Sequence, residues 1–317
     1  ALQVLPTARV AILPSKDANA CLIEGREKAL TNAVLFNADT PKNTRMVNAL
    51  SLYQAAREQV PMGLSWPWEG LTKMTRGIRF GETIYLGAGV KMGKSEAVDQ
   101  IASHLMIEHN LPIFMAKPEQ SNKQTIQKVL GKVAGKVFYD PEVAFDYESY
   151  DKAAELVGNK LNLLNLYQHM GWQSLRDDII TTANNGCRAI FIDPITNLVN
   201  GVSAGETDTQ LKEIAQELAA LAMDLQIVIF IFCHLKAPLS GDPHERGGKV
   251  LSSQFAGSRG MMRSCNLMLG LEGNKDSDKT EEERNMRKLV VLEDREFGSS
   301  GAIDLFWDKN TTLFMEI

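Results

Sequence analysis

Residues 88–95 read Ala-Gly-Val-Lys-Met-Gly-Lys-Ser and combine the residue types that cradle a phosphate chain. Backbone N–H groups of such a loop, with the N-terminus of a following helix, point at phosphate oxygens. A lysine at the seventh position reaches the terminal phosphates, and the serine hydroxyl after it can hold Mg²⁺. The pattern predicts a nucleoside triphosphate site. The residues expected to bind this cofactor are Ala88, Gly89, Met92, Gly93, Lys94 and Ser95.

Three polar side chains follow other apolar runs and could complete this chemistry. Asp193 comes directly after Ala-Ile-Phe-Ile and is expected, with Ser95, to hold the magnesium ion. Glu119 follows the run PIFMA and could orient the attacking water. His234 follows QIVIFIFC and could sense the γ-phosphate. Because ligands bind at the carboxyl ends of parallel strands, we expect these groups to converge on one nucleotide.

The elements that must position these residues alternate between strands and helices from about residue 77. Buried apolar runs separated by helices predict an α/β fold, with a mainly parallel twisted sheet covered by helices on both faces. The expected strands are 83–87, 112–116, 160–167, 187–193 and 226–233, and the expected helices are 94–109, 121–135, 173–185 and 207–224. Strands at 266–272, 287–294, 301–307 and 312–317 lack helices between them, which predicts an antiparallel C-terminal extension.

The first 76 residues differ in composition, with 9 basic and 6 acidic side chains. An amphipathic helix is predicted over residues 46–60 and ends at Pro61. A single helix of this kind has no sheet to cover, so it is expected to pack on its own domain or on a neighbouring subunit. With 317 residues, the chain has room for about two domains.

The net charge of −5 excludes a protein that coats nucleic acid over its whole surface. Residues 234–263 are nevertheless locally basic, at +3, and rich in glycine. They could line a channel for single-stranded DNA, and the alternative is a solvated loop of mixed charge. The expected DNA-binding residues are Lys236, Arg246, Lys249 and Arg259. Lys128, Lys132 and Lys136 have the spacing of one helical face and are expected to face solvent rather than DNA.

The four cysteines, Cys21, Cys187, Cys233 and Cys265, are far apart and form no CxxC pair, which argues against a structural zinc site. No apolar run reaches the length of a membrane span, so no membrane association is expected. Residue 1 is alanine and no signal-peptide pattern follows it, so we expect the chain to be part of something longer.

Together these motifs resemble a known family. GIRFGETIYLGAGVKMGKS (77–95) is similar to the strand and phosphate loop of RecA-like replicative helicases of the DnaB family. The combination of AKPEQS (116–121), FIDPITNLV (191–199) and CHLKAP (233–238) most resembles the helicase domain of phage T7-type bifunctional primase-helicases, with mitochondrial Twinkle more distant. VAILPSKDANACL (10–22) resembles the tail of the Toprim primase domain in the same proteins.

The resemblance implies a role for each matching position. Glu119 corresponds to the catalytic glutamate, Asp193 to the metal aspartate, and His234 to the histidine that links phosphate state to the DNA loop. In LEDREFGSSG (292–301), Arg295 corresponds to an arginine finger that acts on the neighbouring subunit's nucleotide. Such a guanidinium stabilises transition-state charge and is worth roughly 10³ to 10⁵ in rate. Activity would then require a ring, in which the helix 46–60 packs on the adjacent subunit.

Several positions depart from the family pattern. Glu293 stands where the family carries lysine, and Arg263 aligns with a glutamine near the end of the fourth motif. Gly273 aligns with an arginine that flanks the base, and Trp307 aligns with the aromatic residue opposite. We therefore assign Arg263 and Trp307 to the cofactor site, and expect base recognition to differ in detail.

The expected organisation is a Toprim tail over 1–25, a linker with an inter-subunit helix over 26–76, and a RecA-like helicase domain over 77–317. The expected function is a hexameric or heptameric ring that uses Mg²⁺ with ATP or dTTP to move 5′-to-3′ on single-stranded DNA. It would unwind duplex at a fork beside a replisome DNA polymerase, as a phage protein in a bacterial cytoplasm. The alternatives are a RecA- or KaiC-like recombination or regulatory ATPase, and a low-turnover, nucleotide-gated loader.

Overall fold

The computed structural model describes residues 9, 11–38, 48–165, 171–199, 204–238, 240–255 and 263–317. The chain divides into two compact units, Ala1–Pro61 and Met62–Ile317. Each unit is described by itself below.

The first unit contains three helices among its described residues. They are α1 (Ala18–Ile23), α2 (Glu27–Leu35) and α3 (Ala49–Ala56). The side chain of Asp17 caps α1, and that of Asn48 caps α3, each by accepting a hydrogen bond from a backbone N–H of the first turn. Helix α3 buries none of its residues. It is shorter than the predicted helix 46–60, whose first two residues lie outside the described residues.

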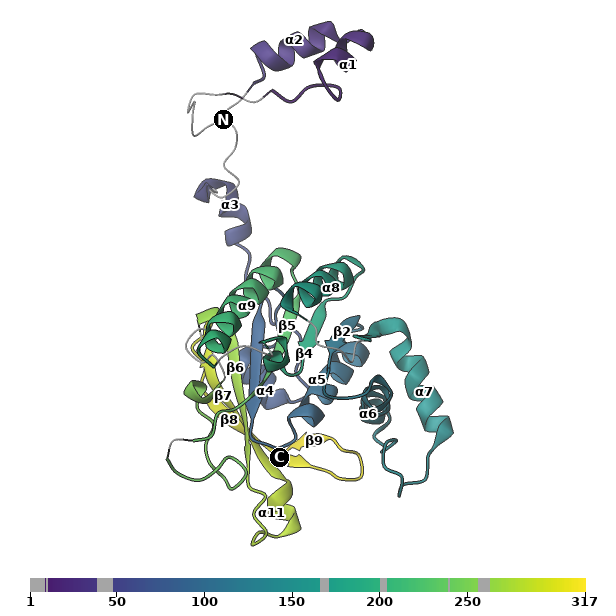
Figure 1. Cartoon of the computed structure of the whole chain (residues 1–317), viewed down its shortest axis with the longest axis vertical. Coiled ribbons are helices and arrows are strands. Elements are labelled where there is room, and N and C mark those ends of the chain that lie inside the picture. Colours follow the sequence, from purple (N-terminus) through teal and green to yellow (C-terminus); the bar gives the residue numbers. More distant parts are fainter. Residues whose placement is uncertain are drawn as a thin grey trace. The chain divides into compact units, whose positions relative to one another are not determined.

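The second unit is built on one sheet of nine strands among the described residues, ordered β3-β2-β4-β5-β1-β6-β7-β8-β9. The strands are β1 (Thr83–Ala88), β2 (Ile113–Ala116), β3 (Leu161–Leu163), β4 (Ala189–Ile192), β5 (Val228–His234), β6 (Leu267–Gly273), β7 (Met286–Asp294), β8 (Gly301–Trp307) and β9 (Phe314–Glu316). Strands β3 to β6 in this order pair in parallel, and β6 to β9 pair antiparallel. The predicted parallel sheet with an antiparallel extension is confirmed (Figure 1).

Helices cover both faces of this sheet. One hydrophobic cluster joins residues of α5, α6 and α7 to one face, and a second joins residues of α8 and α9 to the other. The helices are α4 (Glu69–Thr75), α5 (Lys94–Glu108), α6 (Asn122–Ala134), α7 (Tyr147–Val157), α8 (Trp172–Asn184), α9 (Ala204–Leu225) and α11 (Glu281–Asn285), with 3₁₀ turns η1 (Gly158–Lys160), η2 (Ile195–Val199) and η3 (Ser252–Gln254). Among the described residues, no helix has the length and low polarity needed to cross a lipid bilayer.

Alternation along the central strands explains why both faces are apolar. Ile84 and Leu86 of β1 belong to the cluster with α5, whereas Tyr85 between them belongs to the cluster with α9. Phe191 of β4 stacks on Phe230 of β5, with ring centroids 4.6 Å apart. Full burial of a side chain of this size stabilises the fold by about 1.5–3 kcal/mol. The packed strands give the residues at their carboxyl ends fixed positions.

The boundary of the second unit differs from the expected one at residue 77. Trp66 and Trp68 are buried in its core, and Leu64 forms an antiparallel bridge with Ile78. The Trp68 indole N–H donates a hydrogen bond of 2.9 Å to the carbonyl of Phe314 in the last strand. Residues 62–76, assigned to the linker by sequence, are therefore part of the second unit. The sequence did not indicate this, because two tryptophans anchor the segment and no long apolar run marks it as part of the core.

Candidate active site

The loop between β1 and α5 has the backbone of a phosphate cradle. Gly93, the N-cap of α5, has φ of 100°, a conformation that side chains rarely adopt. A Cβ on Gly93 would lie 2.8 Å from the Phe314 ring, and one on Gly89 would lie 2.5 Å from the Cβ of His244. Both glycines are therefore required by close packing around the loop, and the helix N-terminus behind them favours negative charge.

Lys94, Ser95 and Asp193 lie together at the mouth of this loop. The Lys94 ammonium is 2.5 Å from one oxygen of Asp193, and the Ser95 hydroxyl is 3.4 Å from the other. The Lys94 and Asp193 side chains are only 10% and 6% exposed. A hydroxyl and a carboxylate are oxygen ligands of the kind that Mg²⁺ prefers when substrate phosphates supply the rest. The residues at this position therefore fit a magnesium–nucleotide complex.

Glu119 and His234 form a second, more open pair. The register of β1 and β5 places His234 beside Ala88, at the start of the loop. Its Nε2 is 3.6 Å from a carboxylate oxygen of Glu119, and the two side chains are 50% and 52% exposed. The amide of Asn197, in η2, donates to the same oxygen at 3.4 Å. Sequence reasoning missed Asn197, although it follows Asp193 by only four residues at the same rim.

One cavity of about 460 Å³ joins these groups. The phosphate loop, Glu119, His234 and Trp307 all line it, so the structure brings these predicted residues together. Lys275, Asn285, Arg287 and Phe314 line it as well and were not predicted. Arg263 and Arg295 do not contribute to this cavity, and Asp193 reaches it through its contacts with Lys94 and Ser95.

Arg287 supplies a cation that sequence reasoning missed. It is 4% exposed, and its Nε donates to the carbonyl of Met92 in the phosphate loop at 2.7 Å. Its Nη1 donates to the carbonyls of Arg284 and Met286, each at 2.6 Å. Burial lowers the pKa of this guanidinium to about 10. A buried cation whose donors meet neutral carbonyls is favoured by an anionic ligand beside it.

Arg287 also explains why glycine stands at position 273, where the family resemblance implies an arginine. Gly273 pairs directly with Arg287 across β6 and β7. A Cβ on Gly273 would lie 2.7 Å from Cδ of Arg287 and 3.1 Å from its Nη1. The guanidinium therefore occupies the space beside Gly273 from the neighbouring strand. The signal was present in the sequence, because Arg287 alternates in phase with the inward-facing Leu289 and Val291.

Arg295 stands on a turn outside the cavity. Its side chain is exposed, and Nη1 donates to the carbonyl of Arg263 at 3.2 Å. The Asp294 carboxylate accepts from the N–H groups of Glu296, Phe297 and Ser299 and so holds the turn. The centroid of the Phe297 ring lies 4.3 Å from the guanidinium of Arg76 and 4.4 Å from that of Arg79. The structure places Arg263 beside this turn rather than beside the phosphate loop.

The residues expected to bind DNA have separate supports. Lys236 lies 3.4 Å from Asp208 of α9, and Arg246 lies 3.7 Å from Asp276. Lys249 is exposed. Arg259 lies outside the described residues.

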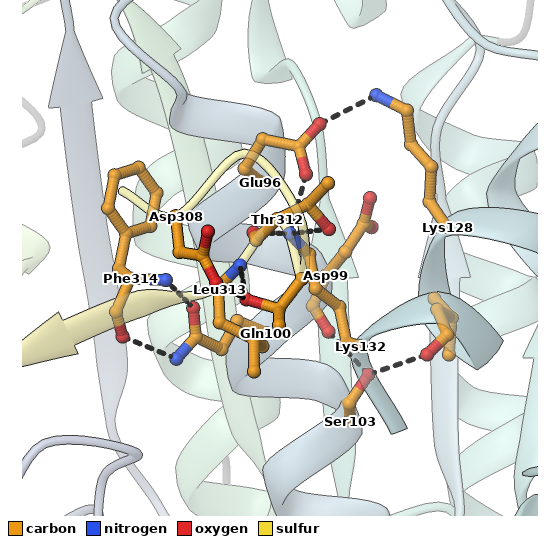
Figure 2. A network of polar contacts seen from close by, with 12 residues as sticks. Glu96, Asp99, Gln100, Ser103, Lys128, Lys132, Asp308, Thr312, Leu313 and Phe314 are labelled. Carbon is orange, nitrogen blue, oxygen red and sulfur yellow. Dashed lines mark hydrogen bonds and ion pairs between the residues drawn. The ribbon is translucent and has the colours of Figure 1, made fainter. Parts of the chain in front are cut away.

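A buried polar network anchors the helix that follows the phosphate loop. Figure 2 shows Glu96, next to Ser95, between two lysines of α6. Lys132 is 2.6 Å and Lys128 is 2.9 Å from the Glu96 carboxylate, and Lys132 also donates to the carbonyl of Thr312. Burial alone would raise the pKa of Glu96, but the two ammonium groups outweigh it and hold the pKa below its usual value.

This network corrects the prediction that Lys128, Lys132 and Lys136 form a solvated face. The Lys132 side chain is 1% exposed and that of Lys128 is 14% exposed. Only Lys136 is exposed among the three, where it pairs with Asp146. Helical spacing placed Lys128 and Lys132 on one face of α6, whereas Lys136 lies beyond the end of the helix at Ala134. The spacing could not show that the Thr312 segment and α5 cover that face.

The network continues to the last strand and to the segment of Glu119. The Gln100 amide accepts from the backbone N–H of Phe314 at 2.8 Å and donates to its carbonyl at 2.9 Å (Figure 2). Asp99, which is fully buried, accepts from the Lys117 ammonium at 2.7 Å. Lys117 precedes Glu119 by two residues. Helix α5 therefore fixes the phosphate loop, the Phe314 wall of the cavity and the base of the Glu119 segment together.

A parallel sheet with a phosphate loop after β1 and an aspartate after β4 is the arrangement of a RecA-like ATPase domain. The family model of the DnaB-like helicase C-terminal domain matches residues 63–316. The chain therefore belongs to the DnaB-like helicase family, and the predicted resemblance is confirmed. The family of replicative helicase ATPases implies the use of a nucleotide with Mg²⁺.

A curated relative and two solved structures agree with this assignment. The chain is 29% identical over 306 residues to a DNA helicase/primase of Enterobacteria phage T3, covering 88% of this chain and 51% of the relative. The chain thus spans about half the length of that protein. The fold matches a solved structure of an ATPase domain with a TM-score of 0.69 at 17% identity, covering 84% of this chain and 96% of that one.

The second structure is a DnaB-like replicative helicase studied with its interactions with primase. It matches with a TM-score of 0.69 at 16% identity and covers 94% of this chain and 72% of that one. At these identities the two structures support the fold alone.

Proposed function

We propose that this chain is the motor of a ring-forming replicative DNA helicase, which couples NTP hydrolysis to movement on single-stranded DNA and to duplex unwinding. The observation that carries the proposal is the convergence of Lys94, Glu119 and His234 on one cavity, with Asp193 paired to Lys94, in a chain of the DnaB-like family. Lys94 and Asp193 hold the phosphates and the metal, and the other two lie where water and the γ-phosphate would meet.

In this proposal each group has one task. Lys94 and the loop N–H groups bind the β- and γ-phosphates of ATP or dTTP, and Ser95 and Asp193 would hold Mg²⁺, which neutralises phosphate charge when bound. Glu119 orients the attacking water, and a hydrogen bond from Asn197 holds the Glu119 carboxylate in place. His234 contacts Glu119 and is itself the first residue of the segment proposed to bind DNA. Trp307, Arg287 and Phe314 form the wall on which the base and sugar rest.

Arg295 supports a ring. It is exposed and lies outside the cavity of its own chain, as expected for a guanidinium that acts on a neighbour's nucleotide. Helix α3, which buries none of its residues, would pack on the adjacent subunit as the inter-subunit helix predicted over residues 46–60. Residues 1–25 would be the end of a Toprim primase domain. The proposed ring holds six or seven subunits, and electron microscopy distinguishes the two.

The polyanion partner of this motor is single-stranded DNA, with 5′-to-3′ movement proposed from the family. Lys236, Arg246, Lys249 and Arg259 would supply phosphate contacts from each subunit around one strand. A replisome DNA polymerase is the expected further partner. The phage relative favours the cytoplasm of an infected bacterium as the setting.

The proposal is tested by hydrolysis rates with and without single-stranded DNA. We expect DNA to stimulate the parent protein, and Glu119→Gln to lose hydrolysis by about 10²- to 10⁴-fold while retaining nucleotide binding. Glu155→Gln, on the exposed face of α7, is the matched control and should behave as the parent. Parent-like hydrolysis by Glu119→Gln would show that the assignment of Glu119 is wrong.

Mixed assemblies test Arg295 directly. Arg295→Ala and Lys94→Ala proteins are each expected to be inactive, the first from the lost finger and the second from lost phosphate binding. When they are mixed, an intact Arg295 from one subunit can face an intact Lys94 of its neighbour, and partial activity should return. Activity that never returns contradicts action in trans.

Electron microscopy with a non-hydrolysable nucleotide separates the remaining possibilities. Closed rings are expected for the helicase, whereas filaments would favour the recombination-type ATPase. Rings with tight nucleotide binding but no DNA-stimulated turnover would indicate the nucleotide-gated loader.

A further inference from the structure

The turn over residues 242–248 touches the phosphate loop directly. The carboxylate of Glu245 accepts a hydrogen bond from the Val90 N–H at 2.9 Å. The Cβ of His244, a residue only 4% exposed, lies 2.5 Å from where a Cβ on Gly89 would stand. These two contacts bind the turn to both residues that open the loop after β1.

The same turn is held firmly on its other side. Arg246 and Gly248 both donate from their backbone N–H to the carbonyl of Pro243, at 2.9 and 3.0 Å. The carbonyl of Glu245 accepts from the Lys275 N–H at 2.7 Å. A Cβ on Gly248 would lie 2.0 Å from the carbonyl oxygen of Asp242, so the turn has almost no room to rearrange internally. It is therefore expected to move as one piece.

This turn is also continuous with the segment proposed to bind DNA. The Nε2 of His244 lies 3.4 Å from the carbonyl oxygen of Lys236, and Arg246 follows Glu245 immediately. Contacts thus run from the main chain of Lys236 through His244 to Gly89, and from Arg246 through Glu245 to Val90. Neither path passes through the pair of Glu119 and His234.

The carboxylate has an electrostatic consequence. Its oxygen accepts a hydrogen bond from a backbone N–H of the loop proposed to bind the phosphates, so the Glu245 carboxylate and a bound triphosphate would repel each other. A charge-assisted hydrogen bond of this kind is about twice as strong as a neutral one, which keeps the turn on the loop despite that repulsion.

We propose that the turn 242–248 is a second coupling element between nucleotide and DNA, in which Glu245 reports the state of the phosphate loop to the DNA-binding segment and lowers nucleotide affinity. This inference rests on the proposed helicase function. His244 packs against the phosphate loop at Gly89, and Glu245 is a positioning residue. Neither takes part in the hydrolysis step.

Two substitutions separate the charge from the contact. Glu245→Gln keeps a side-chain acceptor for the Val90 N–H but removes the charge, and Glu245→Ala removes both. Asp242→Asn changes an exposed carboxylate in the same turn and is the matched control. Nucleotide dissociation constants, basal hydrolysis and DNA-stimulated hydrolysis are measured for all three and for the parent.

We expect Glu245→Gln to bind nucleotide roughly three- to tenfold more tightly, because a like charge near the phosphates is gone. Its stimulation by DNA should stay within about twofold of the parent, because the contact remains. Glu245→Ala should lose most of the stimulation, about fivefold or more, with basal hydrolysis nearly unchanged. A merely structural role would lower basal and stimulated rates together.

Two results overturn the inference. One is an unchanged nucleotide affinity in Glu245→Gln, and the other is parent-like stimulation in Glu245→Ala. If Glu245→Ala fails to fold, the Glu245→Gln affinity decides. A parent protein that DNA does not stimulate overturns the proposed function itself, and the coupling falls with it, whereas stimulation in the parent with parent-like Glu245 variants overturns the coupling alone.

Discussion

The candidate active site has an inner and an outer part that are built differently. In the inner part Lys94 and Asp193 are 10% and 6% exposed and stand 2.5 Å apart. In the outer part Glu119 and His234 are about half exposed and 3.6 Å apart. Arg295, also outer by its place on an exposed turn, contacts only a carbonyl with its guanidinium among the described residues.

The difference follows from what each part must meet. The inner residues bind phosphate and metal, whose positions the loop itself determines, so burial and direct pairing suit them. The outer residues must contact water, DNA or a neighbouring subunit, and nearby side chains hold them in place. Asn197 steadies Glu119 and Phe297 steadies the turn of Arg295.

The largest expected effect is the difference in the free energy of unfolding between Lys94→Ala, in the inner part, and Glu119→Gln, in the outer part. Lys94→Ala removes a phosphate contact, and we expect hydrolysis to fall by on the order of 10³-fold with weaker nucleotide binding. It also leaves Asp193 buried without its cation, so the free energy of unfolding should fall by about 2 kcal/mol or more. Glu119→Gln should change that free energy by less than about 0.5 kcal/mol. Urea unfolding of both proteins makes the comparison, and equal stability losses would contradict it.

Lys128 and Lys132 of α6, with Lys136 just beyond the end of the helix, test how strongly the buried polar network supports the inner part. Lys132→Ala should lower the free energy of unfolding by about 3 kcal/mol, because Glu96 and the Thr312 carbonyl lose a buried partner. Lys128→Ala should cost about 1 kcal/mol, since its side chain is 14% exposed and Lys132 remains. Lys136→Ala, at the exposed end of the face, should cost less than about 0.5 kcal/mol. Any other order among the three would argue against the buried network.

Phe297 tests the indirect support of the outer part. Phe297→Ala removes two guanidinium–ring contacts, each worth about 0.5–1 kcal/mol, and should let the Arg295 turn drift. We expect kcat to fall about tenfold with little change in KM, while Phe297→Tyr keeps the rate. In an Arg295→Ala background the same change should have no further effect, which a double-mutant cycle measures. Additive losses would mean that Phe297 acts elsewhere.

The smallest expected effect concerns Glu82, which pairs with Arg79, one of the two arginines that contact the Phe297 ring. Burial raises the pKa of Glu82 to about 7, Arg79 partly opposes this, and Glu296 and Asp294 add to it. The folded chain then holds a proton that the unfolded chain releases, so this group lowers stability as pH rises from about 4.5 to 7.

Glu82→Gln should remove that dependence. With allowance for its partial exposure, the variant should be more stable than the parent by about 1 kcal/mol at pH 8 and no more stable at pH 4.5. Urea midpoints at the two pH values provide the measurement. Glu155→Gln, an exposed glutamate that does not contribute to the pKa of Glu82, is the control. A gain in stability that is equal at both pH values would rule out titration as its cause.

The sequence predicted the sheet and the inner site well because both depend on local patterns. Apolar runs of four to eight residues located the parallel strands, and the strand before Asp193 placed it at the rim where the structure has it. The loop motif carries its own spacing. Helix α7 was not predicted, and only Ala153 and Val157 among its residues are buried.

What the sequence could not predict depends on contacts between distant segments. Arg287 reaches the phosphate loop across 195 residues of chain, and Lys132 reaches Thr312 across 180. No local spacing encodes such pairs. Charge counting treated Lys128 and Lys132 as solvated and treated Arg246 only as a DNA contact. The structure adds Asp276 to the surroundings of Arg246, and it places the neighbouring Glu245 on the phosphate loop.

The contact between Trp68 and Phe314 bears on how the protein is made. These residues are 246 positions apart, and the Phe314 carbonyl also accepts from Gln100 on the phosphate-loop helix. A ribosome releases Trp68 and Gln100 long before β9, so the cavity lacks one wall until synthesis of the unit is nearly finished. Nucleotide binding on the nascent chain should therefore appear late and abruptly, which makes ligand capture a marker of completed folding rather than a guide to it.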